Sequence, residues 1–439
     1  MRKVGDVEVL VISQYWKPEN GVPQRRWAWL SEMLSKGGHS ITVVAPPSQD
    51  ERKVSFLEWF RRRGWRAQQD FESGPAEENI ARTGFFPAGK SLTFRAMNQT
   101  AIALSQIAVI IRKRGLPRDY RPDVVIGTVP ALPTSVVTRI AGKRFGVPYV
   151  IDLRDAWPDL LHQSDRWNDS VGKISVRQKV LSKGPLQAVA GITKWFLYRV
   201  LRDANSIIVT SSELANNLRT RDELRSNGKV PPIFTIRNVF PVETAYRRVQ
   251  SNSASREALH VLYAGTIGRA QDLQNALKAV EICRDRGVDV KLRMVGSGAA
   301  KAALHEHARS LRGTVTFERR SPAETLDEHY KWADTALVHL ADWEPLSRTV
   351  PSKLYELMET GVHISAVVRG EAAGLVNTLN VGDVVAPSSP EKLADLWSDL
   401  LSNPGRLEIG ETGRKWVERE RSLVSPAVML KVLEGVVFK

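Results

Sequence analysis

Residues 260–298, HVLYAGTIGRAQDLQNALKAVEICRDRGVDVKLRMVGSG, decide the predicted fold. The apolar run HVLYAG predicts a buried strand, TIGRAQ a loop, and LQNALKAVEICRDRG a helix that ends at Gly287. KLRMVGSG predicts a second strand followed by a glycine-containing loop. Because two strands joined by a helix pair in parallel, the stretch predicts a βαβ unit.

The same alternation continues on both sides of this unit. Downstream, TVTFE, TALVHL and HISAVV predict strands separated by helices, and upstream the strands are VEVLVIS, SITVVAP, DVVIGT, VPYVIDL, SIIVTS and IFTIRNV. Continuous Val/Ile runs are typical of parallel sheets with both faces buried. Residues 48–95 break the pattern. The chain therefore predicts an α/β fold of two Rossmann-like, doubly wound parallel-sheet domains that face a cleft.

The boundaries of these domains follow from length and periodicity. A chain of 439 residues suggests two or three domains. The segment 244–257, TAYRRVQSNSASRE, lacks apolar periodicity and is the predicted linker. We expect an N-terminal domain over 1–243, a C-terminal domain over 258–412, and a terminal helix over 413–439 that returns to the first domain.

Composition restricts partners and compartment. Lys and Arg total 63 against 48 Asp and Glu, and the net charge of +15 favours polyanions such as nucleic acid, anionic membrane or phosphorylated substrates. The single cysteine, Cys283, excludes an internal disulfide and fits a reducing compartment. Apolar runs fall short of the roughly 18 residues that cross a bilayer, and Asp6 and Glu8 interrupt any signal-peptide core. We expect a cytoplasmic protein.

One glycine motif suits a phosphate group. Gly265-Thr266-Ile267-Gly268-Arg269 follows a strand and precedes a helix. Glycines let the backbone approach a phosphate, a helix N-terminus presents free N–H groups, and Arg269 adds a charge-assisted contact. A simple tight turn explains the glycines equally well.

A second motif, Val350-Pro351-Ser352-Lys353-Leu354-Tyr355-Glu356, opens a later helix. Lys353 lies at the positive helix end, and Glu356 shares its face. This face offers a cation for phosphate and a carboxylate for ribose hydroxyls. An ordinary surface pair is the alternative.

These segments together resemble a known family. The chain is similar to family 4 retaining glycosyltransferases of the GT-B fold, and it looks closest to the branch that adds sugars to bacterial cell-surface polysaccharide precursors. The segments that carry the resemblance are VISQYWKPENGVPQRRWAWLSEMLSKGGHSITVV, GVPYVIDLRDAWPD, VLYAGTIGRAQDL, MVGSG and PSKLYELMETG…GEAAGLV.

The resemblance implies a role for each motif. The N-terminal domain would bind the acceptor, with Asn20, Gly21 and Trp157 near it. The C-terminal domain would bind the nucleotide sugar. Its donor-binding residues would be Gly265, Thr266, Gly268 and Arg269 at the diphosphate with Lys353, Glu356 at the ribose, Gly296 and Gly298 at the base, and Glu371 nearby.

The sequence also departs from the broad family pattern. Arg348 stands where most members carry a glutamate eight residues before the ribose-binding one, and Arg154 stands where many carry a histidine. Arg154 and Asp155 follow a parallel strand, where open α/β sheets place their ligands, and are the predicted catalytic residues. Asp155 could take the proton of the acceptor hydroxyl or simply pair with Arg154.

The sequence indicates neither a metal nor a cofactor. His305 and His307 lie on different helix faces, and no Asp-x-Asp signature occurs. The family generally works without a bound metal, so helix dipoles and cations would stabilise the departing diphosphate.

Two basic aromatic segments bear on membrane contact. Phe56–Arg66 lies outside the βα pattern, and its Trp and Arg residues favour an anionic membrane surface. In Lys194–Arg202 we expect Trp195, Phe196 and Leu197 to pack into the core. The protein would then be peripheral on the inner face of the plasma membrane.

The sequence thus predicts retaining transfer of a sugar from a nucleoside-diphosphate donor to a polyprenyl-diphosphate-linked acceptor in cell-envelope glycan synthesis. Alternatives are a sugar-nucleotide 2-epimerase of the same fold and a catalytically silent binding subunit. Nucleic acid is not an expected partner, because the basic residues are spread out.

Overall fold

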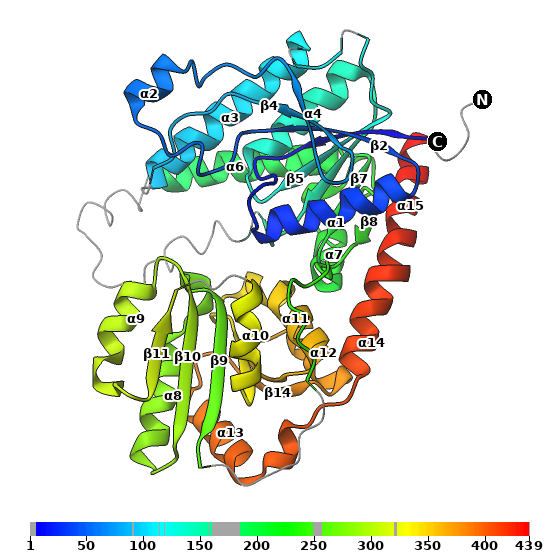
Figure 1. Cartoon of the computed structure of the whole chain (residues 1–439). Coiled ribbons are helices and arrows are strands. Elements are labelled where there is room, and N and C mark those ends of the chain that lie inside the picture. The colour runs from blue at the N-terminus through cyan, green and yellow to red at the C-terminus, as the bar shows by residue number, and fades with distance from the viewer. Residues whose placement is uncertain are drawn as a thin grey trace.

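A computed structural model describes residues 6–89, 92–113, 115–117, 119–157, 159, 185–248, 257–319 and 323–438. These residues form two α/β units that lie one above the other in Figure 1, with the C-terminal helices running along one side of both. The predicted pair of doubly wound parallel-sheet domains is confirmed.

The first unit is built on a sheet of eight strands among the described residues, in the order β3-β4-β2-β1-β5-β6-β7-β8. Every neighbouring pair is parallel except β3 with β4. The strands are β1 (Glu8–Ile12), β2 (Ser40–Ala45), β3 (Phe71–Ser73), β4 (Asn79–Arg82), β5 (Val124–Val129), β6 (Tyr149–Leu153), β7 (Ser206–Val209) and β8 (Ile233–Thr235). The helices are α1 (Val22–Lys36), α2 (Phe56–Arg61), α3 (Leu92–Arg112), α4 (Pro133–Phe145), α6 (Pro185–Arg202) and α7 (Ser212–Arg219).

Two local expectations differ from this unit. The segment 48–95, which breaks the βα pattern, contains β4, and β4 extends the sheet in parallel beside β2. The strand was missed because NIAR is short and carries a single β-branched residue. In α6 only Leu197 of the three expected core residues is buried, while Trp195 and Phe196 are 57% and 47% exposed. Successive residues point about 100° apart on a helix, so one face cannot bury all three.

The second unit is a fully parallel sheet of six strands within the described ranges, in the order β11-β10-β9-β12-β13-β14. Its strands are β9 (Leu259–Thr266), β10 (Val290–Ser297), β11 (Val315–Glu318), β12 (Thr335–His339), β13 (His363–Val367) and β14 (Gly382–Val385). Its helices are α8 (Gln274–Asp285), α9 (Lys301–His307), α10 (Ala323–Trp332), α11 (Ser352–Thr360), α12 (Glu371–Leu379) and α13 (Pro390–Ser402).

The order of strands reverses at the first strand of each sheet. β1 lies between β2 and β5, and β9 lies between β10 and β12. Open α/β sheets bind ligands outside the carboxyl ends of their strands at such a switch point. The topology therefore directs attention to the loops that follow β1, β9, β10 and β12.

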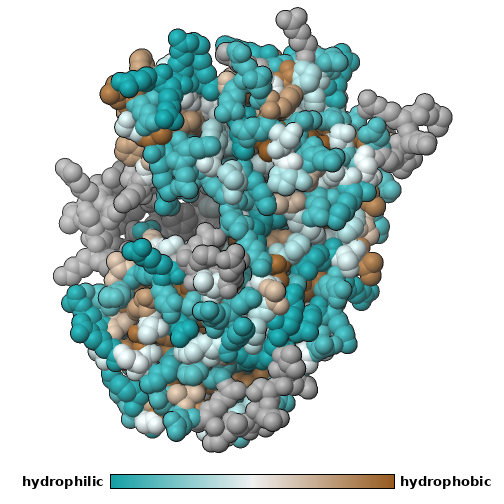
Figure 2. All heavy atoms as spheres, in the orientation of Figure 1, coloured by the Kyte–Doolittle hydropathy of each residue, from teal (hydrophilic) through white to brown (hydrophobic). Residues whose placement is uncertain are grey.

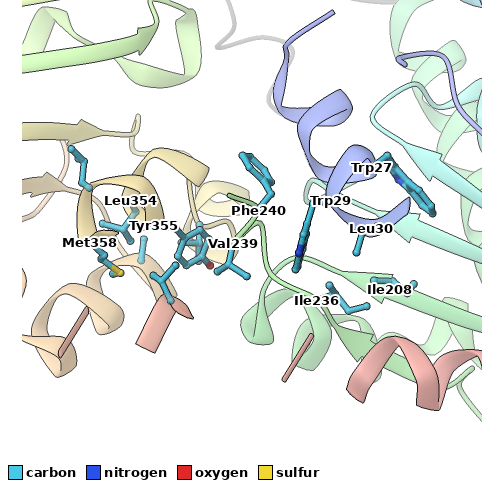
Figure 3. Close-up of a cluster of buried hydrophobic side chains, with 14 of the residues drawn as sticks. Trp27, Trp29, Leu30, Ile208, Ile236, Val239, Phe240, Leu354, Tyr355 and Met358 are labelled. Carbon is cyan, nitrogen blue, oxygen red and sulfur yellow. The ribbon is translucent and has the colours of Figure 1, made fainter. Parts of the chain in front are cut away.

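One continuous cluster of buried side chains joins the two units. Figure 3 shows Trp29 and Leu30 of α1 directed towards Ile236, with Val239 and Phe240 leading on to Leu354, Tyr355 and Met358 of α11. Trp27, on the other side of α1, belongs to the same cluster. The segment after β8 thus belongs to the apolar core of both units. This shared core fixes how the two sheets face one another.

Backbone hydrogen bonds and the C-terminal helices strengthen this contact between the two units. Arg248, just after the first unit, donates its backbone N–H to Thr360 O in α11 at 2.8 Å. Helix α14 (Thr412–Arg419) contacts α11, continues through a π-helical turn (Glu420–Val424), and α15 (Ser425–Val437) packs against β5 and β8. Arg421 Nε donates to Val239 O at 2.6 Å. Within the described residues, no helix is both long and apolar enough to cross a membrane.

Candidate active site between the two domains

A cavity of about 850 Å³ opens between the two units. A recess between the two units is visible in the space-filling view (Figure 2). Its walls come from the loop before α1, the segment after β6, the carboxyl ends of β9, β10 and β12, and the start of α11. These are the positions that the two switch points indicate. Eleven of the fourteen sequence-predicted site residues line it: Asn20, Gly21, Arg154, Asp155, Trp157, Gly265, Thr266, Arg269, Gly296, Lys353 and Glu356.

The second unit forms one wall from the ends of β9 and β10. Gly265 and Thr266 close β9, and Gly296 lies opposite Gly265 in the parallel register. A Cβ on Gly296 would come within 1.9 Å of Gly265 O, so this approach of the two strand ends requires glycine. Gly298 has the same packing function, because its Cβ would meet Ile267 O at 2.1 Å, and it does not line the cavity.

Arg269 enters the cavity from a 3₁₀ turn rather than from an α-helix N-terminus. The turn covers Arg269–Gln271, and α8 begins only at Gln274. The prediction that Arg269 lies at an α-helix N-terminus is therefore wrong. Gly268 lies outside the cavity lining, and its N–H is donated to Gln271 Oε1 at 3.2 Å. The Arg269 Nε is buried without a hydrogen-bond partner among the described residues.

Lys353 and Glu356 lie on one face of α11, as predicted. Lys353 Nζ is 3.0 Å from Glu356 Oε1, which also accepts a 2.6 Å hydrogen bond from the Tyr330 hydroxyl. Burial raises the pKa of Glu356, but the charge of Lys353, the Tyr330 bond and Arg25 outweigh burial and hold the pKa below its ordinary value. Glu356 is only 7% exposed, so the pair is not an ordinary surface pair.

The first unit supplies the opposite wall from α1 and its preceding loop. Gly21 is the N-cap of α1, and Asn20 hydrogen-bonds Glu243. Arg25, one turn into α1, reaches across to Glu356 Oε2 at 3.9 Å and to Glu243 at 3.8 Å. The acidic and basic groups of the two units therefore meet in the cavity.

Arg154, Asp155 and Trp157 follow β6 in this wall. Burial raises the pKa of the Asp155 carboxyl, and the neighbouring Arg154 charge opposes that shift only in part. Among the described residues, Arg154 forms no ion pair with Asp155 within 4 Å. A buried carboxyl with a raised pKa is suited to accept a proton near neutral pH.

Two further sequence expectations fall at the contact between the units. Arg348, which replaces the usual glutamate, bonds Asp159 and Glu344 through Nη2, each at 2.9 Å. Glu371 does not line the cavity, because its carboxylate pairs with Arg237 and accepts the Glu213 N–H at 2.8 Å. Glu371 ties α12 to α7, and its donor-binding role stays a prediction.

Sequence reasoning missed other residues of the lining, among them Arg25, His339 and Trp343. His339 ends β12, and its Nε2 lies 3.0 Å from the Asn275 amide nitrogen. Burial lowers its pKa to about 3, so the imidazole is neutral. The signal was available, because His339 lies at the carboxyl end of the predicted strand TALVHL, where ligands bind.

The two units match two described protein families. Residues 21–232 match the family described as "Glycosyl transferase 4-like domain", and residues 248–421 match "Glycosyl transferases group 1". The chain belongs to the family 4 glycosyltransferases. The two matches cover the two walls of the cavity of this glycosyltransferase.

Relatives agree with this family. The "Putative colanic acid biosynthesis glycosyl transferase WcaI" of Escherichia coli K12 is 24% identical over 400 residues, which cover 88% of the glycosyltransferase and 90% of the relative. Sucrose-phosphate synthase from Thermosynechococcus elongatus superposes with a TM-score of 0.65 at 15% identity, covering 97% and 98% of the two chains. Anabaena HepE, solved with UDP and glucose, has a TM-score of 0.60 at 13% identity, covering 98% and 100%. The two structures show the GT-B fold.

Proposed function

We propose that this glycosyltransferase moves a sugar from a nucleoside-diphosphate donor to a polyprenyl-diphosphate-linked acceptor in cell-envelope polysaccharide synthesis, with retention at the anomeric carbon. The observation that carries the proposal is one cavity in which two cations, Arg269 and Lys353, accompany the buried carboxylate Glu356. Cations suit a diphosphate and a carboxylate suits ribose hydroxyls. The name of WcaI and the UDP in HepE support the pathway and the donor class.

The transfer assigns a task to each wall of the cavity. For the configuration to be retained in one step, the acceptor hydroxyl oxygen forms its bond to the anomeric carbon on the same face from which the diphosphate departs. The bond from that carbon to the diphosphate oxygen breaks, and the diphosphate leaves with the electron pair. Arg269 and Lys353 would stabilise the negative charge that develops on the leaving oxygen. Asp155 on the facing wall would take the hydroxyl proton, because its raised pKa keeps it basic.

Nucleotide binding tests the donor site. Calorimetry with UDP and with GDP should show tight binding of one nucleotide, and Arg269→Ala should weaken it at least tenfold, since a charge-assisted contact contributes about 1.5–3 kcal/mol. Arg309→Ala removes an exposed arginine that pairs with Glu306 and is the matched control. Equal affinities of the Arg269 and Arg309 variants would exclude the assigned diphosphate contact.

An exposed apolar surface on the first unit supports a lipid-linked acceptor. We call Phe56, Leu57, Phe60, Trp65, Phe94 and Met97 the aromatic patch; all are at least 41% exposed. Helix α2 buries none of its residues. Phe86 joins the two parts of the patch, with ring centroids 6.4 Å from Phe56 and 6.2 Å from Phe94. Brown side chains gather where α2 lies (Figure 2).

Basic side chains accompany this patch. Arg61, Arg62 and Arg63 follow Phe60 and are exposed, although Arg62 pairs with Glu58. Apolar rings beside arginines bind the headgroup region of anionic bilayers. A membrane-held acceptor would therefore reach the cavity from the first unit, which contains the predicted acceptor residues.

Vesicle binding tests the aromatic patch. We expect vesicles of phosphatidylethanolamine and phosphatidylglycerol to bind the wild-type protein, and the double substitution Phe56→Glu with Phe60→Glu to weaken binding at least tenfold. Leu423→Glu is the control, because Leu423 is 65% exposed in the π-helical turn far from α2. Equal binding of wild type and the double variant would contradict membrane contact through the patch.

A further inference from the structure

The buried guanidinium of Arg154 has no ion-pair partner among the residues that the structure describes. It is 7% exposed and lines the cavity. Its Nε and Nη1 are buried with no hydrogen-bond partner, and among the described residues it forms no ion pair. Guanidinium nitrogens are all donors, and a buried donor without an acceptor destabilises the fold. The protein tolerates this cost at a position that faces a ligand cavity.

The neighbouring carboxylates do not neutralise Arg154. Asp152, two residues earlier in β6, is committed to Arg26 Nη2 at 2.8 Å and to Trp27 Nε1 at 3.0 Å. Asp155, the next residue in the chain, forms no ion pair with Arg154 within 4 Å among the described residues. Burial first, and then the charge of Arg26, lowers the pKa of Arg154 to about 10, so the guanidinium stays charged at neutral pH. Arg154 is therefore a buried cation on the cavity wall with no ion-pair partner in the described part of the chain.

Rigid structure holds Arg154 in place. Its carbonyl accepts a 2.9 Å hydrogen bond from the Thr210 hydroxyl, and the preceding residue, Leu153, is in register with Val209 of β7. The backbone that carries the Arg154 side chain is thus anchored to the sheet of the first unit. Arg269 and Lys353, the proposed diphosphate cations, stand on the second unit across the cavity. Two separate cationic positions face each other.

We propose that Arg154 forms a second anion subsite, which binds a carboxylate or phosphate carried by the transferred sugar or by the acceptor. The inference rests on the proposed function, because that function assigns the donor diphosphate to the opposite wall. A site built to pair with a charged group discriminates strongly against a ligand that lacks it, since the buried donor is then left unpaired. Arg154 would therefore determine substrate specificity.

Matched sugar nucleotides test the sugar as the source of the anion. Calorimetry compares UDP-glucose with UDP-glucuronate, and GDP-mannose with GDP-mannuronate, which differ only at the C6 carboxylate. If the sugar carries the anion, the wild-type protein binds the acidic member of one pair at least tenfold more tightly. Arg154→Gln then abolishes this preference and binds UDP or GDP as the wild type does.

Farnesyl diphosphate tests the acceptor as the source. The protein is saturated with UDP or GDP and titrated with farnesyl diphosphate, and we expect Arg154→Gln to raise its Kd at least tenfold if the acceptor carries the anion. Arg154→Lys keeps the positive charge and should therefore weaken the binding of farnesyl diphosphate less than Arg154→Gln does. Arg144→Gln on α4 removes an exposed arginine and controls for net charge.

The outcomes are distinguishable from failure of the proposed function. An effect of Arg154→Gln below tenfold in both arms overturns the inference. If neither UDP nor GDP binds the wild-type protein, the proposed donor site is wrong, and farnesyl diphosphate binding without nucleotide still measures the contribution of Arg154. A melting temperature of Arg154→Gln close to that of the wild type shows that lost binding is not lost folding.

Discussion

Asp152→Asn should strongly destabilise the protein, although Asp152 touches no part of the cavity. Asp152 and Arg26 are both fully buried, and Asp152 accepts hydrogen bonds from Arg26 Nη2 at 2.8 Å, Arg26 Nε at 3.3 Å and Trp27 Nε1 at 3.0 Å. Asparagine keeps the shape but removes the charge, and its NH₂ group replaces one of the two accepting oxygens. Arg26 is then a buried cation without its counter-ion.

The magnitude follows from this geometry. Breaking a buried ion pair by removing one partner costs about 3–5 kcal/mol. That is a large part of a total stability of roughly 5–15 kcal/mol. In a domain of about 150–250 residues each kcal/mol shifts the melting temperature by about 2–4 °C, so we expect a decrease of about 6–20 °C.

The effect should reach the site because Arg26 connects its parts. Arg26 Nη1 donates to Ile236 O at 2.9 Å and to Asn238 Oδ1 at 3.1 Å, and Asn238 lines the cavity. Asp152 lies two residues before Arg154 on β6. Loss of the pair should therefore loosen two segments of the first wall together.

Differential scanning calorimetry measures this prediction, with Arg154→Gln as the matched control from the same wall. Arg154 has no side-chain partner among the described residues to leave unpaired, so its substitution should change the melting temperature by less than about 2 °C or raise it, because an uncompensated buried charge is removed. A decrease below about 3 °C for Asp152→Asn, or an equal decrease for both variants, would refute the reasoning.

Two further predictions concern the cavity, and a third concerns the contact between the units. Asp155→Asn should lower turnover about a hundredfold with unchanged nucleotide affinity. It should also remove the acidic limb of the pH–rate profile, because wild-type turnover falls as the pH drops through the raised pKa of Asp155. Normal turnover in steady-state kinetics would exclude this role. Because the pKa of Glu356 lies below its ordinary 4.5, its carboxylate stabilises the fold above that pH, and the contribution is lost as the pH falls through the lowered pKa. The difference in unfolding free energy between wild type and Glu356→Gln, measured in urea, should therefore shrink in acid. A difference that stays constant with pH would contradict this prediction. Arg348→Gln should cost only about 1 kcal/mol in urea unfolding, since Asp159 keeps Arg221 at 2.5 Å; a loss above about 3 kcal/mol would show that Arg348 carries the contact between the units.

Part of the site was predictable because strand ends are visible in the sequence. The glycine motif at Gly265 and the Lys353–Glu356 pair follow from apolar periodicity and helix geometry, and the structure places Gly265, Lys353 and Glu356 in one cavity. His339 was predictable by the same rule. Glu371 was not, because its partner Arg237 is far away in the sequence and no local pattern indicates that contact.

The sequence by itself determined the two parallel sheets, since Val/Ile runs and 3.6-residue periodicity express burial that depends on neighbours along the chain. Only the tertiary structure decided which charges are compensated. Arg26 and Arg154 are both buried arginines of the first unit. Arg26 is paired with Asp152, whereas Arg154 has no ion-pair partner in the described ranges and lines the cavity. That difference arises from segments that meet only in the folded chain, because a charge is stabilised by atoms within a few ångströms in space, whatever their separation in sequence.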